Sequence, residues 1–123
     1  MTIALWCVLA AAALPFLFTA LAKTSRKFSN ARPRDYLETT EGWRKRAHWA
    51  QLNSFEAFPP FAAAVIINHM LKGATPAASE LALGFIAFRV LYGLCYLADQ
   101  ATLRSLMWFA ANVCVIALFV HAA

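Results

Sequence analysis

The sequence predicts an all-α integral membrane protein, a four-helix up-down transmembrane bundle formed by a single domain, residues 1–123. Hydrophobic residues make up 62% of the chain and charged residues 14%, which leaves too little polar surface to cover a soluble domain of this size. The apolar residues fall into separate segments, each close to the roughly 20 helical residues that cross a bilayer. These segments are residues 3–22, 47–71, 77–98 and 103–122.

The first segment carries no charge and ends in Thr-Ala-Leu-Ala before Lys23, a pattern that also fits a secretory signal peptide. However, no basic residue precedes its apolar run, and that run is longer than the apolar region of a typical signal. We therefore expect a retained spanning helix.

Most of the 11 Lys and Arg residues lie in the connection between the first two segments, residues 23–46. Cytoplasmic loops are enriched in Lys and Arg, so this loop is predicted to be cytoplasmic and both termini to lie on the opposite side. A basic stretch can also bind nucleic acid, but this loop contains no recognisable binding module, so we expect contact with lipid and no nucleic-acid partner. Its cations are Lys23, Arg26, Lys27, Arg32, Arg34, Arg44, Lys45 and Arg46.

The later connections are tight turns, so the second, third and fourth helices are expected to pack as antiparallel neighbours. Thr75 followed by Pro76 is typical of an N-cap with proline at the first helical position. Gly84 and Gly93 are small residues that allow helices to approach closely in lipid.

Two charged residues interrupt the apolar segments at matching depths. Glu56 lies ten residues after Arg46, the last loop cation, and Arg89 lies ten residues before Asp99. At 1.5 Å per residue both are about 15 Å deep, where an ionised side chain needs a partner. We therefore predict a Glu56–Arg89 pair inside the bundle.

Helical spacing places further polar residues beside both charges, and together they are predicted to line a cleft that opens to the cytoplasmic side. Such a cleft suits a small anion, because arginine binds carboxylates in a bidentate fork and hydroxyl groups donate to anions. A purely structural role for the Glu56–Arg89 pair stays equally open, and both roles can hold at once. The cleft residues are Arg46, Asn53, Glu56, Pro60, Arg89, Tyr92, Tyr96, Arg104 and Ser105.

The cysteines and histidines do not suggest a metal site. Cys7, Cys95 and Cys114 are scattered through the apolar segments, and neither they nor the three histidines have metal-ligand spacing. We expect the cysteines to be packing residues and predict no metal site.

The polar motifs of the spanning segments resemble those of the MAPEG family, the membrane-associated proteins of eicosanoid and glutathione metabolism. The resemblance covers nearly the whole chain and points to a bacterial-type member, located in the bacterial inner membrane. In RAHWAQLNSFEAFPPF the matching residues are Arg46, Asn53, Glu56, Pro59 and Phe61. In RVLYGLCYLADQATLRSLMW they are Arg89, Val90, Tyr96, Arg104 and Ser105.

This resemblance implies a homotrimer that binds glutathione as a co-substrate between neighbouring subunits, near the cytoplasmic side. Asn53 and Glu56 would hold the backbone and amino group of glutathione, and Arg104 with Ser105 would stabilise its thiolate. The thiolate would attack a small lipophilic electrophile or peroxide arriving from the bilayer, as in a glutathione transferase or peroxidase. The predicted binding residues are Asn53, Glu56, Arg89, Tyr92 and Tyr96, of which Arg89 and Tyr92 come from the predicted cleft, and the implied catalytic residues are Arg104 and Ser105.

The chain departs from the eicosanoid-processing branch of that family. Trp49 and Leu52 stand where that branch has arginines, Trp108 stands in place of a tyrosine and Tyr92 in place of a histidine. An eicosanoid synthase is therefore not expected. The alternative to a glutathione-dependent enzyme is a non-catalytic protein that keeps the scaffold for a structural, assembly or lipid-binding role.

Overall fold

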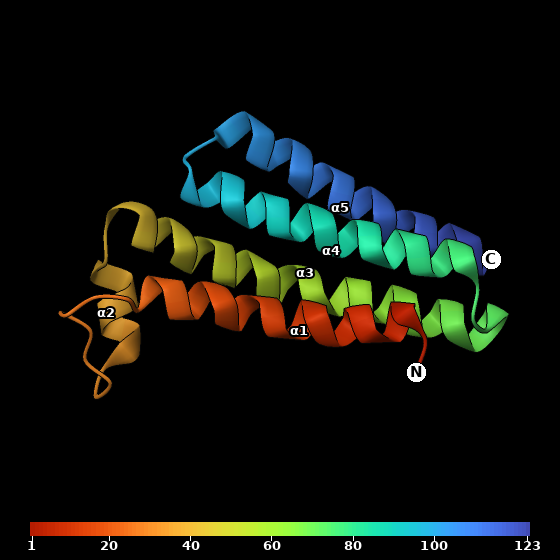
Figure 1. Ribbon diagram of the computed structural model, residues 1–123, viewed down its shortest axis with the longest axis horizontal. Helices are drawn as coiled ribbons and strands as arrows, with labels where there is room; N and C mark the ends of the chain where they lie inside the picture. The colour runs from red at the N-terminus through yellow and green to blue at the C-terminus, as the bar shows by residue number, and fades with distance from the viewer.

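The computed structural model describes residues 1–123, and every regular element in it is a helix. Four long helices lie side by side, and a short helix covers one end (Figure 1). The long helices are α1 (Ile3–Ala22), α3 (Gly42–Lys72), α4 (Pro76–Leu97) and α5 (Ala101–Ala122), and the short helix is α2 (Pro33–Thr39). The prediction of an all-helical chain is confirmed.

Consecutive long helices run antiparallel and form two closely packed pairs, α1 with α3 and α4 with α5 (Figure 1). The pairs contact each other through α1 and α4, α3 and α4, and α3 and α5. Both termini lie at the same end as the turn between α3 and α4 (Figure 1). The opposite end, which carries α2 and the turn between α4 and α5, is called the loop end below.

The helix bounds differ most from expectation in the basic segment 23–46. Helix α3 begins at Gly42 rather than at residue 47, and α2 occupies part of the predicted loop. The prediction followed apolar composition, which stops at charged residues, whereas a helix continues through lysine and arginine because both favour helical backbone. Helices α4 and α5 also begin slightly earlier than the predicted residues 77 and 103.

The predicted cap of α4 is confirmed by its geometry. The Thr75 side-chain oxygen accepts a hydrogen bond of 3.2 Å from the backbone N–H of Ala78, and Pro76 follows at the first helical position. Helix α3 ends just before this turn at Lys72 and is capped by Gly73, whose φ of 72° suits glycine. These two signals fix the short turn between antiparallel neighbours.

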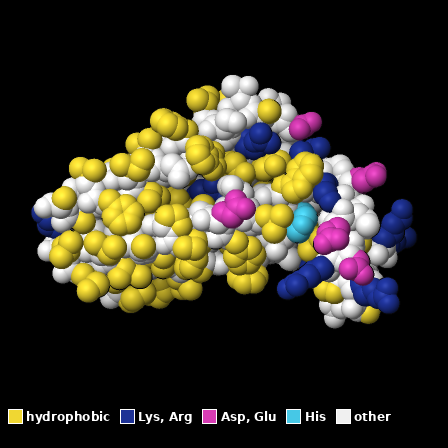
Figure 2. Space-filling model, turned by 180° about the vertical axis from the view of Figure 1, so that it is seen from behind, with side chains coloured by type: hydrophobic (Ala, Val, Ile, Leu, Met, Phe, Trp, Pro, Cys, Tyr) yellow, Lys and Arg dark blue, Asp and Glu magenta, His cyan; other side chains and the backbone are white.

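The outer surface is apolar over most of its length. Helices α1, α4 and α5 are each long and apolar enough to cross a membrane. Helix α3 is not in that group; its 31 residues include the loop-end cations, Asn53 and Glu56. Hydrophobic side chains cover the body of the molecule, and charged ones gather mainly at the loop end (Figure 2).

Small residues allow the helices to approach closely inside the bundle. A Cβ atom added to Gly93 would lie 1.9 Å from Cζ of Phe18, so α1 and α4 meet here only because residue 93 is glycine. At Gly84 the nearest atom to such a Cβ is Sγ of Cys114, at 3.4 Å. The expected close approach is therefore confirmed, and it is much tighter at Gly93 than at Gly84.

Candidate functional site

Arg89 is held in the interior by side chains of the neighbouring helix α3. Its side chain is 2% exposed. One terminal nitrogen donates to Oδ1 of Asn53 at 2.9 Å, and the other donates to Oγ of Ser54 at 3.3 Å. Ser54 in turn donates to the backbone carbonyl of Ala50 at 2.7 Å. The charge of Arg89 is thus solvated by protein dipoles, as a charge in a spanning helix must be.

The predicted direct Glu56–Arg89 pair is wrong, because Asn53 stands between the two charges. The Asn53 amide nitrogen donates to Oε2 of Glu56 at 3.0 Å, while its oxygen accepts from Arg89. Counting residues gave the depth of each backbone position but not the direction of each side chain. Arg89 meets the polar residues one turn closer to the loop end, and Glu56 lies on the exposed surface of the protomer.

A groove between α3 and α4 contains most of the predicted binding residues. Its volume is about 350 Å³, which lies within the size range of small-molecule sites. Asn53 and Glu56 supply its polar wall, and four larger side chains supply the rest. The lining residues are Trp49, Leu52, Asn53, Glu56, Tyr92 and Tyr96.

Two aromatic rings, with a cation at each end, connect the buried arginine to the start of α5. The guanidinium of Arg89 lies 4.3 Å from the ring centre of Tyr92, and the Tyr92 and Tyr96 rings meet edge to face at 5.6 Å. The guanidinium of Arg104 lies 4.5 Å from the ring centre of Tyr96. Arg104 is therefore placed beside the groove through Tyr96, and such cation–π contacts hold a partly exposed arginine in position.

Three predicted cleft residues lie elsewhere in this protomer. The Ser105 hydroxyl donates to the carbonyl of Ala101 on its own helix, at 3.1 Å. Arg46 donates twice to the carbonyl of Leu97, at 3.2 and 3.3 Å, and so caps the end of α4. Neither residue, nor Pro60, lines the groove.

The sequence interpretation missed Ser54 as a partner of Arg89. A serine beside Asn53 in an apolar helix was the available signal, because a hydroxyl at membrane depth needs a partner. It also missed Asn68, a fully buried residue whose amide nitrogen donates to the carbonyl of Leu118 at 2.8 Å and contacts Nδ1 of His121 at 3.0 Å. That contact joins α3 to α5 at the end opposite the groove.

Comparisons with known proteins agree with the membrane character and the polar motifs. The profile of the MAPEG family matches residues 3–123, essentially the whole chain. A comparison with individual proteins of curated function finds no match. The family match, together with the apolar helices α1, α4 and α5, makes this an integral membrane protein. The chain belongs to the MAPEG family of membrane proteins, which is associated with glutathione and eicosanoid metabolism.

Proposed function

We propose that the protein is a glutathione-dependent transferase or peroxidase-like enzyme whose groove between α3 and α4 binds the thiol. The observation that carries this proposal is the position of Glu56. Its carboxylate is exposed in a groove at membrane depth, and its one hydrogen bond within the protomer is to Asn53. An acid facing lipid is strongly unfavourable, so Glu56 requires a partner from outside the protomer.

A homotrimer in the bacterial inner membrane is part of this proposal. The chain would form one four-span transmembrane domain, with α3 as the additional span and the basic loop end in the cytoplasm. A neighbouring subunit packed over the groove would shield Glu56 from lipid and complete the binding site. The positions of the termini, both at the end opposite the basic segment, support this topology.

The residues in and beside the groove fit the chemical groups of glutathione. Glu56 can accept hydrogen bonds from its ammonium group, and Asn53 orients the Glu56 carboxylate. Tyr92 and Tyr96 offer hydroxyl groups, which both donate and accept hydrogen bonds. Arg104, whose guanidinium lies beside Tyr96, is a cation next to the groove that can face a carboxylate or thiolate.

In the proposed mechanism, this chain contributes binding, orientation and electrostatic stabilisation. A cation such as Arg104 lowers the pKa of a bound thiol and so raises the fraction present as thiolate. The thiolate sulfur then forms a bond to an electrophilic carbon, and the displaced group leaves with the bonding electrons. Ser105, one residue further along α5, would donate to the sulfur in the assembled site. Trp49 and Leu52 provide an apolar wall for a lipophilic substrate that enters from the bilayer.

Calorimetric titration of the detergent-solubilised protein with glutathione tests this proposal. We expect saturable binding that weakens about tenfold or more in Arg104→Gln, because a charge-assisted contact is lost. Arg34→Gln is the matched control, since Arg34 is an exposed cation on α2, far from the groove in the sequence and outside its lining. No heat of binding at millimolar glutathione, or equal affinity in both variants, would contradict the proposal.

A non-catalytic role in assembly or lipid binding is the second candidate. It is favoured by the environment of Arg89, whose two side-chain hydrogen bonds both go to residues of the same protomer, Asn53 and Ser54. Under this alternative, Glu56 would contact only a neighbouring subunit. The Arg104→Gln variant would then assemble as the native protein does, and neither protein would bind glutathione.

A further inference from the structure

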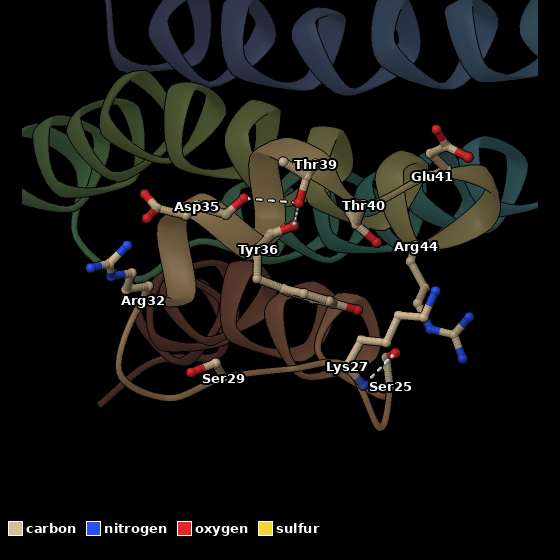
Figure 3. Close-up of a pocket in the computed structure, with 10 residues that line it drawn as sticks. All are labelled: Ser25, Lys27, Ser29, Arg32, Asp35, Tyr36, Thr39, Thr40, Glu41 and Arg44. Carbon is tan, nitrogen blue, oxygen red and sulfur yellow. Dashed lines mark hydrogen bonds between the residues drawn. The ribbon is translucent and has the colours of Figure 1, made fainter.

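A second cavity lies at the loop end, away from the groove. It has a volume of about 730 Å³ and is lined by the segment between α1 and α3 and by Arg44 in the first turn of α3. Its lining is almost entirely polar, which distinguishes it from the apolar body of the protein (Figure 3). We call it the loop pocket; it includes Ser25, Lys27, Arg32, Tyr36, Thr40 and Arg44.

Hydrogen bonds to the end of α1 hold this pocket in shape. The Tyr36 hydroxyl donates to the carbonyl of Ala22 at 3.3 Å. Arg44 donates to the carbonyl of Thr24 through Nε at 3.0 Å and through a terminal nitrogen at 2.7 Å. A guanidinium has five N–H donors, so Arg44 is fixed in position and still has donors free. The pocket is therefore formed before any ligand arrives.

Buried apolar contacts hold α2 against the bundle as well. Leu37 packs with Ala22 and Ala47, all three of which are buried. The ammonium group of Lys45 donates to the carbonyls of Leu37 and Glu38 at the end of α2. Helix α2, which contributes Asp35, Tyr36 and Thr39 to the lining, is thus packed against the bundle.

The pocket lies at the depth of lipid headgroups. Helix α1 has 20 residues and is about 30 Å long, which equals the thickness of the hydrocarbon core. The lining begins at Ser25, just beyond the end of that helix. Tyr36 lies in the same segment and Trp43 in the first turn of α3, and tyrosine and tryptophan are enriched at the membrane–water interface.

The electrostatics of the pocket favour an anionic group. Desolvation raises the pKa of the Tyr36 hydroxyl, but its contacts with Ser25 and Thr40 act against that effect. The positive charges of Arg44 and Lys27 also lower this pKa, and the net value is below the ordinary one. The hydroxyl therefore lies in a positive potential. In Figure 3 the side chains of Lys27 and Arg44 extend toward the same side of the pocket.

The pocket also contains two acids, Asp35 and Glu41. Together with the cations Lys27, Arg32 and Arg44 they make the lining close to neutral rather than strongly basic. A ligand with a phosphate and an ammonium group complements such a mixed lining better than a purely anionic one.

We propose that the loop pocket binds the headgroup of a zwitterionic phospholipid, with its phosphate on Lys27 and Arg44 and its ammonium group on an acid of the lining, Asp35 or Glu41. The lipid tails then lie along the exposed apolar surface of the spanning helices. This proposal is independent of glutathione binding, since it rests on a different cavity and on the membrane setting alone.

Calorimetric titration of the protein in an uncharged detergent tests this site with three probes. They are a short-chain phosphatidylethanolamine, a diacylglycerol with the same acyl chains, and phosphoethanolamine without chains. We expect the complete lipid to bind most tightly. Equal binding of the diacylglycerol would overturn recognition of the headgroup, and equal binding of phosphoethanolamine would show a site for soluble phosphate esters instead.

Variants locate the binding in the pocket. Lys27→Gln is expected to weaken phosphatidylethanolamine binding about fivefold, as for one cation removed from a lipid surface. Arg34→Gln removes an equal charge from the same segment outside the pocket, and we expect unchanged affinity. Because the Lys27 side chain makes none of the hydrogen bonds that hold the pocket, Lys27→Gln should fold normally. If both variants bind phosphatidylethanolamine equally weakly, the proposal that the headgroup binds in the loop pocket is wrong, and the lipid responds only to the overall positive charge of the segment.

Discussion

The buried polar cluster of Arg89, Asn53 and Ser54 and the open groove at Glu56 are joined by one residue, yet their environments are opposite. In the cluster, the charge is enclosed and its hydrogen bonds end on protein atoms. In the groove, the charge is exposed and accepts one hydrogen bond, from Asn53. Asn53 bridges the two regions with its amide nitrogen and oxygen.

This difference separates the roles of two charges that sequence spacing treated as partners. A buried charge that donates to side chains of the neighbouring helix fixes the relative position of two helices, and it contributes without any ligand. An exposed carboxylate at membrane depth needs something that the protomer does not provide. We therefore expect substitutions in the cluster to change stability and substitutions in the groove to change binding.

Arg89→Ala should have the largest effect on stability. It opens a cavity and leaves Asn53 and Ser54 without their donor, although the recovered desolvation of the charge offsets part of the loss. We expect the free energy of unfolding to fall by about 2 to 4 kcal/mol. Unfolding in mixed micelles measures this change. Arg104→Ala, which removes the same side chain from a partly exposed site, should cost less than about 1 kcal/mol. Equal costs would remove the distinction between the two regions.

Gly93→Ala tests the packing beside the cluster. The added Cβ would overlap the Phe18 ring, which is buried and has little room to move. Overpacking of this kind typically costs about 1 to 3 kcal/mol. The same substitution at Gly84, where the nearest atom is 3.4 Å away, should cost clearly less. Melting temperatures of the two variants in one detergent give the comparison, and a more stable Gly93→Ala variant would contradict this account of helix contact.

Asn53→Ala should affect both regions at once. Loss of the charge-assisted hydrogen bond from Arg89 should lower stability by about 1 to 2 kcal/mol. Loss of the amide donor also frees the Glu56 carboxylate to move, so the affinity for glutathione should fall in the same variant. Unfolding and calorimetry on one preparation test this. A change in only one of the two quantities would show that Asn53 does not connect the regions.

Much of the fold could be predicted from the sequence, because apolar segment length and turn signals such as Thr75-Pro76 are local. The bounds of α1 and the antiparallel order of the long helices followed from these signals. The loop end was less predictable, since α2 is short and is stabilised by contacts of Leu37 with α1 and α3 that lie far away in the sequence.

Part of the candidate groove could be predicted as a set of residues, but its geometry could not. Spacing placed Asn53, Glu56, Tyr92 and Tyr96 on facing stripes, and all four line the groove. Which atom meets which depends on helix rotation, and a shift of one turn moved the partner of Arg89 from Glu56 to Asn53. Ser105 is similar, because its role in the proposed site depends on the neighbouring subunit.

The central claim is that Glu56 serves binding and Arg89 serves folding, and Glu56→Gln tests it most directly. The amide keeps an oxygen that can accept from Asn53 but removes the charge. We predict a change in stability below about 0.5 kcal/mol and an affinity for glutathione about tenfold lower, measured by unfolding and by calorimetric titration of the same sample. Unchanged glutathione binding together with a large loss of stability would contradict the account, because Glu56 would then be a structural residue like Arg89.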